Sequence, residues 1–390
     1  MFVLVANIGS TSYKYRLFET EGEKVLAEGK AERIGRSGNF PDHASAIRDS
    51  LAAIAGANKP LASLRQLGAV GFKAVHAGPI TGAQIVDEKV LDAMEEFSFF
   101  APAHNPPYIA AMRAFQRELP DVPLVAVFET AFFENLSEAA VTYALPAAWK
   151  EEHGIRRYGF HGASHRAASE RVRDQFGESD LRHISCHLGG SSSVAAIKNG
   201  VAVDISFGIS PQSGLPQTHR VGDVDAFAIL FMMKKLNLGV DEMASMLGSQ
   251  SGLAGISGLS GDVRDLEAAA RSGDERAHLA LDVFVRAVRH YIGAFFVELG
   301  GLDVLTFSGG IGENSAGIRS AICHGLSVIG IEIEAERNRF VRCQGTISTN
   351  ASPVKVMVLP ADEEIIVARA TAAVVSASLL EAKPATRNGQ

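Results

Sequence analysis

The sequence predicts an α/β protein built from two similar halves. Strand-like and helix-like patterns of apolar residues alternate along the chain, as they do in proteins that pack helices against a sheet. A chain of 390 residues is long enough for two domains, each with its own core. Two parts of the chain also repeat the same order of strand, polar loop and strand. We therefore expect two related domains with a cleft between them.

The first copy of the repeat starts near the N-terminus. The apolar strand "FVLVA" leads into "NIGSTS", a second strand "YKYRLFE", a turn at "TEGE" and a third strand that starts at "KVLAEG". Glycine and hydroxyl residues between strands can form a turn and nothing more. They can also direct backbone N–H groups at an anion, and Lys14 would add a positive charge there. This loop is therefore either a plain turn or one part of a phosphate site.

The second copy of the repeat reads "HISCHL", "GGSSS", "VAAIK", "NG" and "VAVDIS" in order. Asn-Gly between apolar runs predicts a tight hairpin, because both central residues of a type I′ turn need positive φ. The Gly/Ser loop recurs at the equivalent place, and this recurrence strengthens the phosphate interpretation of both loops.

A third glycine-rich element reads "VLTFSGGIGENSAGIRSAI", where an apolar strand enters three glycines and leaves as a helix. Exposed N–H groups and the helix dipole at such a junction can bind an anion or a nucleotide. The spacing fits neither G-x-x-x-x-G-K-[ST] nor G-x-G-x-x-G, which excludes a P-loop and a Rossmann dinucleotide site. A tight turn without a ligand is the alternative.

Helical periodicity is clearest over residues 105–117, 161–176, 223–235, 274–299 and 313–326. The last ten residues, "EAKPATRNGQ", have the composition of a disordered tail.

Composition and charge exclude several classes of protein. With 37 basic and 44 acidic residues, the formal charge of -7 argues against a broad nucleic-acid surface. We find no secretory leader and no apolar run of about 18 residues, so we expect a cytoplasmic protein without a membrane partner. The three cysteines are odd in number and scattered, which predicts neither a disulfide framework nor a thiolate metal site.

Two histidines lie in the segment "RRYGFHGASHR". His161 and His165 are four residues apart and would share a helix face, as zinc ligands do, but no Glu follows His161 and no third ligand is evident. A histidine beside Arg156, Arg157 and Arg166 could instead help to hold negative charge, or could be purely structural.

Arg220 and two carboxylates are further candidates. Arg220 precedes a helix for which Asp223 would be the N-cap, so its guanidinium could bind a phosphate or lie on the surface. Glu129 and Glu363 each follow an apolar strand. Acidic residues at strand ends are natural Mg²⁺ ligands or proton acceptors, although solitary ones are often simply solvated.

Nine segments together resemble the acetate kinase family, in the family's order and over nearly the whole chain. They are "NIGSTSYK", "HNPP", "VFETAF", "RRYGFHGASH", "HLGGSSSVAAIKNG", "HRVGDVD", "SGLAGISGLSGDVRD", "FSGGIGENS" and "PADEE". The resemblance implies duplicated RNase H-like domains of the actin, Hsp70 and sugar-kinase type, with ATP and Mg²⁺ in the cleft. It implies an N-terminal domain of residues 1–132 and 364–390, a second domain of residues 133–363, and a homodimer.

The implied activity is the reversible transfer of the γ-phosphoryl group of ATP to a short-chain carboxylate, which yields an acyl phosphate and ADP. The resemblance places Asn7 and Glu363 as metal ligands, and Glu129, His161 and Arg220 as catalytic residues. It places the acceptor at Lys73, Val75, Ala103, Phe160 and Pro211. The ATP-binding residues would be Lys14, His187, Leu188, Gly189, Gly190, Ser191, Asp262, Val263, Arg264, Gly310, Ile311, Gly312, Glu313 and Asn314.

The chain departs from the family pattern mainly on the acceptor side. Lys73 replaces an arginine that holds the carboxylate, and a lysine lacks the bidentate fork. Glu129 replaces an aspartate, and Phe133 replaces a histidine. Gly190 replaces an asparagine near the phosphates, and Ala103 replaces a leucine of the acyl pocket. We therefore expect ATP handling to be retained while the acceptor changes.

Three hypotheses follow. The first is a kinase of acetate or a related short-chain acid, with a longer acyl chain favoured because Ala103 enlarges the pocket. The second is a degenerate, ATP-binding member with a regulatory role. The third, a kinase of a different acceptor such as a sugar, is disfavoured by the histidine segments, which match the carboxylate kinases.

Overall fold

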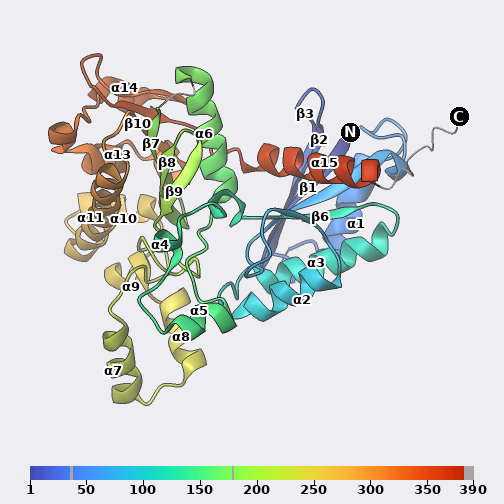
Figure 1. Cartoon of the computed structure of the whole chain (residues 1–390), viewed down its shortest axis with the longest axis horizontal. Coiled ribbons are helices and arrows are strands. Elements are labelled where there is room, and N and C mark those ends of the chain that lie inside the picture. The colour runs from blue at the N-terminus through green and yellow to red at the C-terminus, as the bar shows by residue number, and fades with distance from the viewer. Residues whose placement is uncertain (36–37, 178–179, 382–390) are drawn as a thin grey trace, which may run out of the picture. The chain divides into compact units, whose positions relative to one another are not determined.

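The computed structural model describes residues 1–35, 38–177 and 180–381, and it separates into two compact units (Figure 1). The first unit comprises residues 1–134 and 362–390, and the second comprises residues 135–361. Disorder was expected for residues 381–390; Glu381 is the last residue of a helix, and residues 382–390 lie outside the described residues. None of the described helices is long and apolar enough to span a membrane.

The first unit contains a six-stranded sheet of order β3-β2-β1-β4-β6-β5. Its strands are β1 (Phe2–Gly9), β2 (Ser12–Glu19), β3 (Lys24–Glu32), β4 (Leu67–Ala74), β5 (Ala83–Ile85) and β6 (Leu124–Phe128). The strands β1, β2 and β3 form an antiparallel meander, and β4 and β6 continue the sheet in parallel with β1. The predicted first repeat therefore forms the three strands that the pattern indicated.

Helices cover both faces of this sheet, because β1, β4 and β6 are apolar on both sides. The C-terminal helix α15 (Glu363–Glu381) packs its Val367 and Val375 against Val3 and Val5 of β1. On the other face, Phe115 of α3 (Asn105–Glu118) contacts Phe72 of β4 edge to face. The unit is completed by α1 (His43–Ile54), α2 (Glu88–Glu96) and the 3₁₀ turns Leu64–Gln66, Phe97–Phe99 and Ala131–Phe133.

The second unit repeats this topology in a sheet of order β11-β12-β10-β7-β8-β9. Its strands are β7 (Arg182–Leu188), β8 (Ser192–Lys198), β9 (Val201–Ile205), β10 (Val304–Ser308), β11 (Gly345–Thr346) and β12 (Lys355–Val358). The meander β7-β8-β9 corresponds to β1-β2-β3, and β10 and β12 lie parallel to β7 as β4 and β6 lie parallel to β1. The duplication and the α/β class are thus confirmed.

Helices form the rest of the regular secondary structure in the second unit. They are α4 (Glu138–Val141), α5 (Ala147–His153), α6 (Gly162–Phe176), α7 (Ala226–Leu236), α8 (Val240–Ser249), α9 (Gly252–Ser257), α10 (Val263–Arg271), α11 (Glu275–Glu298), α12 (Gly309–Asn314), α13 (Ala316–Cys323) and α14 (Ala335–Phe340), with a 3₁₀ turn at Leu326–Ile329. The long helix α11 supplies Phe284, Val288 and Ile292 to a core that also contains residues of β7 and β10.

Two helix starts differ from the sequence prediction. Asp225, not Asp223, is the N-cap of α7, because the carboxylate of Asp223 instead accepts a hydrogen bond from the Gly214 N–H at 2.7 Å. The helix expected over 313–326 begins earlier, at Gly309, and is broken at Ser315, whose hydroxyl accepts a hydrogen bond from the Ile318 N–H and so caps a new helix.

Candidate active site

In the first unit, Asn7 and Lys14 are directly opposite each other on β1 and β2. Opposite residues of an antiparallel pair project from the same face of the sheet, so the two predicted residues are neighbours. Tyr108 of α3, which the sequence did not suggest, donates a hydrogen bond to Oδ1 of Asn7 at 3.3 Å and accepts one from the Ile8 N–H at 3.1 Å. Burial raises the pKa of Tyr108, so the phenol stays neutral and orients the Asn7 amide.

Lys73, Glu129 and Glu363 form a cluster in the same unit. The Nζ atom of Lys73 lies 2.6 Å from Oε2 of Glu363 and 3.9 Å from Oε1 of Glu129. Lys73 is on β4, Glu129 directly follows the adjacent parallel strand β6, and Glu363 is the first residue of α15. Burial alone would lower the pKa of Lys73, but the two carboxylates outweigh it and raise that pKa above its usual value. The ammonium is therefore permanently charged.

The predicted acceptor residues of the first unit flank a buried amide. Val75 is buried after β4, and Ala103 is exposed two residues before α3. Asn105, which the sequence analysis did not single out, donates hydrogen bonds from Nδ2 to the carbonyl oxygens of His76 and Met94, each at 2.7 Å. These bonds attach the segment that follows β4 to the start of α3, and so hold the backbones around Val75 and Ala103.

In the second unit, two histidines share one serine hydroxyl, and a third histidine lies against one of them. His161 has a left-handed backbone (φ 62°) just before α6, and its Nδ1 lies 2.9 Å from Oγ of Ser193 on β8. The same hydroxyl lies 2.8 Å from Nε2 of His165, whose Nδ1 lies 2.9 Å from Oγ of Ser185. The ring of His187 lies 4.3 Å from that of His161, centroid to centroid. Ser193 thus fixes the orientation of the predicted catalytic histidine.

His165 is a structural residue and not a metal ligand, since serine hydroxyls occupy both of its ring nitrogens. Burial and the neighbouring His187 hold its pKa well below the usual value. Over the described part of the chain, there is no group of three or more His, Cys, Asp or Glu residues that could hold a metal ion by itself. The zinc alternative for His161 and His165 therefore gains no support from the geometry.

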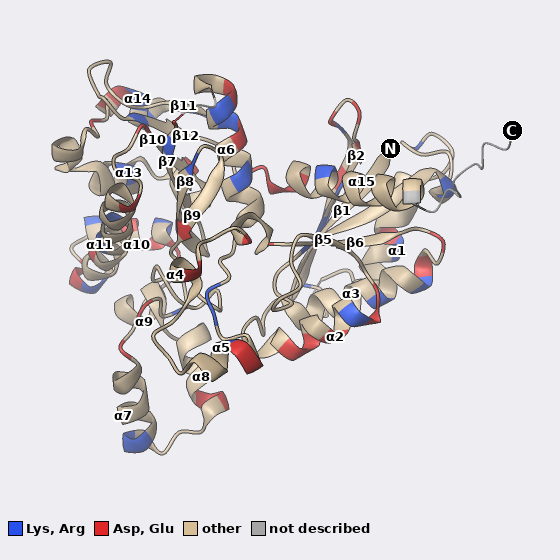
Figure 2. Ribbon diagram, viewed as in Figure 1, with Lys and Arg blue, Asp and Glu red and all other residues tan. Residues whose placement is uncertain are grey.

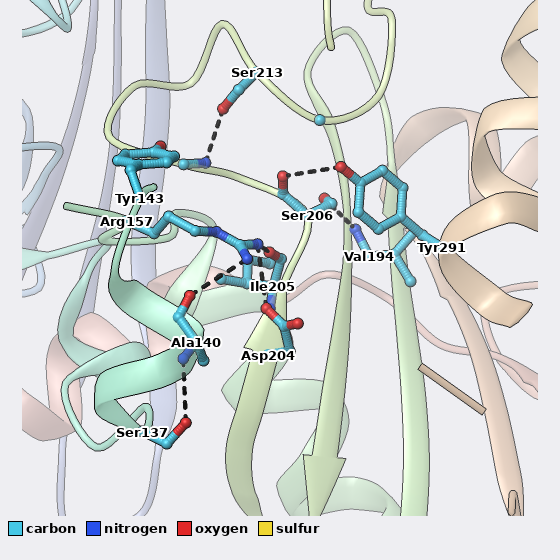
Figure 3. A network of polar contacts seen from close by, with 12 residues as sticks. Ser137, Ala140, Tyr143, Arg157, Val194, Asp204, Ile205, Ser206, Ser213 and Tyr291 are labelled. Atoms are coloured by element: carbon cyan, nitrogen blue, oxygen red, sulfur yellow. Dashed lines mark hydrogen bonds and ion pairs between the residues drawn. The ribbon is translucent and has the colours of Figure 1, made fainter. Parts of the chain in front are cut away.

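Two of the arginines near His161, Arg157 and Arg166, form ion pairs with other side chains. Figure 3 shows Arg157 donating to the carbonyl oxygens of Ala140 and Ile205 and forming an ion pair with Asp204 at 3.1 Å. Arg166 pairs with Glu170 one helical turn away. Arg157 therefore ties α4 to the end of β9 and supports the segment that leads to Phe160, which is buried against Phe207.

Arg220 is partly buried, so the surface alternative for this residue is wrong. Its Nη1 lies 3.3 Å from Oγ of Ser191, 3.4 Å from the Pro211 carbonyl oxygen and 3.2 Å from Oε1 of Gln217. Gln217 is buried and donates from Nε2 to the same Pro211 carbonyl at 2.7 Å. Burial lowers the pKa of Arg220, but a guanidinium keeps its charge. Arg220 thus joins the predicted residues Ser191 and Pro211, and Gln217 contacts both Arg220 and Pro211.

Two of the three predicted nucleotide segments of the second unit lie against each other. A Cβ atom on Gly309 would lie 2.6 Å from the Leu188 carbonyl oxygen, and one on Gly189 would lie 3.7 Å from the Gly310 nitrogen. The buried Arg319, which the sequence analysis passed over, donates to the carbonyl oxygens of Gly312 and Glu313 at 2.9 Å each. The β7–β8 turn and the β10–α12 junction therefore form one glycine-lined surface, and it includes Leu188, Gly189, Gly190, Ser191, Gly310, Ile311, Gly312, Glu313 and Asn314.

The third nucleotide segment begins helix α10. Asp262 caps this helix by accepting from the Arg264 N–H at 2.9 Å, Val263 is buried, and the Arg264 side chain is exposed. One turn further on, Glu267 accepts a hydrogen bond from Ser315 at 2.5 Å. This bond fastens α10 to the start of α13, directly after the glycine-lined surface.

The comparison with known proteins decides the family. The model described as the Acetokinase family matches residues 2–369.

The chain belongs to the acetokinase family.

An acetate kinase from Shouchella clausii is 39% identical over 388 residues, which cover 95% of this chain and 98% of that protein. Among solved structures, the acetate kinase of Porphyromonas gingivalis is similar with a TM-score of 0.86 and 36% identity, over 96% of this chain and 99% of that one. A propionate kinase from Francisella tularensis has a TM-score of 0.87 and 30% identity, over 95% and 99% of the two chains.

Membership of the acetokinase family confirms the resemblance, the duplicated fold and the enzyme class, a phosphotransferase with a carboxyl group as acceptor. It supports the first of the three hypotheses over the degenerate member. The roles of individual residues stay predictions, and the contacts described above show which substitutions can test them.

Proposed function

We propose that this protein phosphorylates a short-chain carboxylate with ATP and Mg²⁺, reversibly, to give an acyl phosphate and ADP. The observation that carries the proposal is the pair of ordered side chains, an imidazole and a guanidinium, in the second unit. His161 is held by Ser193, and Arg220 is held by Gln217 and Ser191. Hydrogen-bond donors and positive groups with fixed positions are what phosphoryl transfer requires of a protein, because charge spreads over the equatorial oxygens of the transferred group.

The nucleotide would bind along the glycine-lined surface, whose backbone can approach phosphates closely. Lys14, His187 and the segment Asp262, Val263 and Arg264 would complete its site. Magnesium would be held by Asn7 and Glu363, which offer the hard oxygen donors that the ion prefers. Two protein ligands suffice for a magnesium ion that is bound mainly through substrate phosphates.

In the transfer step, a carboxylate oxygen of the acceptor forms a bond to the γ-phosphorus as the bond from that phosphorus to the bridging oxygen breaks. The electron pair of the broken bond leaves with ADP, and no proton needs to move because the acceptor is already ionised. His161 and Arg220 stabilise the charge on the phosphoryl oxygens. Lys73 would hold the acceptor carboxylate, and Glu129 would hold Lys73 in place.

The acyl chain would lie among Val75, Ala103, Phe160 and Pro211. Because Ala103 is smaller than the leucine of the family pattern, we propose propionate or a longer acid as a better acceptor than acetate. One methylene in an apolar pocket is worth about 1 to 3 kcal/mol, so the preference should not exceed about 200-fold.

Trapping of the acyl phosphate as a hydroxamate tests the function directly. Purified protein should convert acetate, propionate and butyrate with ATP and Mg²⁺, with the highest kcat/KM for an acid longer than acetate. Replacement of His161 by Ala should lower kcat by about 10² to 10³-fold, as loss of one donor to a developing charge does. If no acid yields product while ADP still binds, the protein is not a carboxylate kinase.

We further propose that the two compact units are its two domains, that it acts in the cytoplasm, and that it is a homodimer.

The support for the dimer is the surface formed by helix α7 and its flanking residues. The helix has no buried residue, although its sequence "AFAILFMMKKL" is mostly apolar. Exposed large apolar side chains on this surface are Val224, Phe227, Leu230, Phe231, Met232, Leu236 and Val240. An apolar surface of this kind is typical of a protein interface, and a second copy would bury it symmetrically.

A further inference from the structure

We propose that Lys73 couples metal binding to acceptor binding: it is held by Glu363 until a divalent metal takes that carboxylate, and then it is released to hold the acceptor. This inference rests on the proposed function, since it assigns a binding order to the same site. It concerns the residues of this chain and is tested by binding, without turnover.

The direct observation is that Lys73 contacts the carboxylate that is proposed as a metal ligand. Oε2 of Glu363 lies 2.6 Å from the Lys73 ammonium, a short, charge-assisted contact. An ammonium and a divalent cation repel each other and cannot share one carboxylate without cost. Metal binding at Glu363 must therefore weaken the contact with Lys73.

Glu129 gives the released ammonium a second anchor. Its Oε1 is already 3.9 Å from Nζ of Lys73, and its own backbone N–H donates to the Ala74 carbonyl at 2.8 Å. The side chain of Glu129 is only 4% exposed and that of Lys73 only 18% exposed, so neither can move far into solvent. The backbone of Lys73 is fixed by its pairing with Val127 across β4 and β6. Release is therefore a local movement of the ammonium toward Glu129 and the acceptor.

The charge of the cluster explains why the metal should come first. One ammonium and two carboxylates carry a net charge of -1. An acceptor carboxylate that approaches this cluster alone meets a negative site. When a divalent cation joins, the net charge becomes +1, and an acceptor carboxylate then neutralises it. Salt only weakly screens interactions between charges in a mostly buried site, so this change in net charge should alter acceptor binding.

The identity of residue 73 suits this movement. An arginine, as the family pattern has, could bind both carboxylates at once through its planar fork and would be held more rigidly. Lysine is a point charge on a flexible stem, so it can change partners by rotating its last bonds. The longer side chain of Glu129, in place of an aspartate, reaches toward this ammonium. We infer that Lys73 and Glu129 are matched substitutions.

Calorimetric titration of propionate into protein saturated with ADP tests the coupling, because ADP has no γ-phosphoryl group to transfer. In the wild type, excess Mg²⁺ should tighten propionate binding about tenfold relative to EDTA, within the usual range for coupled sites. By reciprocity, propionate should tighten Mn²⁺ binding by the same factor. The electron paramagnetic resonance signal of free Mn²⁺ measures this binding. Equal propionate affinity with Mg²⁺ and with EDTA would overturn the proposal.

Variants separate this role from simple acceptor binding. Lys73→Met should bind Mn²⁺ more tightly than the wild type in the absence of acceptor, because Glu363 has lost its competing cation, and should show a coupling factor near one. Lys73→Arg, which retains the charge if the methionine variant does not fold, should show weaker coupling than the wild type. The control Lys30→Met, an exposed lysine of β3 that pairs with Glu32, should retain the full factor. A Lys73→Arg variant with undiminished coupling contradicts the proposal.

The two hypotheses fail in different ways. Absence of acyl hydroxamate from every acid removes the proposed function. Normal hydroxamate formation without metal–acceptor coupling removes only the role of Lys73.

Discussion

At the scale of single residues, the second unit keeps several polar side chains uncharged inside its core. His183 on β7 is 1% exposed, and its Nε2 lies 2.8 Å from Oγ1 of Thr306 on the adjacent strand β10. Burial lowers its pKa to about 3. His165 is shifted in the same direction, mainly by burial. Neither residue bears on the proposed chemistry directly, but both link the stability of the unit to pH.

The direction of that link follows from proton counting. Between about pH 6.5, the pKa of an unfolded histidine, and the depressed value in the fold, the unfolded chain binds a proton that the folded chain does not. Acidification through this window therefore lowers the free energy of unfolding, by about 1.4 kcal/mol per pH unit for each such histidine.

We predict that His183→Gln makes this dependence shallower. Urea unfolding between pH 6.5 and 5 should give a slope about 1 kcal/mol per pH unit smaller than in the wild type. The exposed His278 provides a matched control, and His278→Gln should leave the slope unchanged. Equal slopes for His183→Gln and the wild type would show that His183 titrates normally in the fold.

At the scale of elements, the β10–α12 junction and the β7–β8 turn each contain a glycine, but for different reasons. Gly309 has φ +76°, and a Cβ atom there would lie 2.6 Å from the Leu188 carbonyl oxygen, so only glycine fits. Gly190, in the β7–β8 turn, does not have a left-handed backbone, and the nearest atom to its Cβ position is Cγ2 of Thr218 at 3.8 Å. The backbone conformation at residue 309 requires glycine, whereas residue 190 has room for a side chain.

This contrast yields a paired prediction. Gly309→Ala should lower the free energy of unfolding by about 1 to 3 kcal/mol and weaken ADP binding, because the strained backbone must shift. Gly190→Asn should be as stable as the wild type and should bind ADP about fivefold or more tightly, since an amide would be added beside the phosphates. Thermal unfolding and ADP calorimetry on both variants measure these effects. A stable Gly309→Ala variant with normal ADP affinity would refute the assignment of this junction.

At the scale of the whole molecule, the surface of α7 contrasts with the rest of the second unit. Figure 2 shows this helix without charge except near its end, where Lys234 and Lys235 lie in the last turn. Phe227 and Phe231 are 79% and 61% exposed and lie one helical turn apart, on the same face. Apolar side chains exposed to this degree on one helix favour burial in an assembly.

The proposed dimer can be tested through these two residues. The wild type should have the mass of a dimer by size-exclusion chromatography with light scattering, and the Phe227→Ser/Phe231→Ser double variant should have that of a monomer. Val328, which is 86% exposed outside this helix, supplies the control, and Val328→Ser should remain dimeric. A monomeric wild type, or a double variant that stays dimeric, excludes this interface.

The class and the duplication of the fold could be predicted from the sequence. Apolar periodicity and the repeated strand, loop and strand order depend on neighbouring residues, so they can be read along the chain. The glycine-rich loops and the segments around His161 and Arg220 could be identified for the same reason. The start of α7 was missed because the carboxylate of Asp223 accepts a hydrogen bond from Gly214 in a preceding loop. The helix break at Ser315 was also missed, although the N-cap bond from Ile318 that marks it is local.

Which side chains meet depends on tertiary packing and could not be predicted from the sequence. Lys73 and Glu363 are 290 residues apart and come together because α15 packs against the sheet that contains β4. Tyr108, Gln217 and Arg319 were not singled out from the sequence, since a residue that orients another is recognised only by its contacts. Sequence motifs identify reactive and ligand-binding side chains. The contacts that position those side chains join distant residues, so they depend on how the whole unit packs.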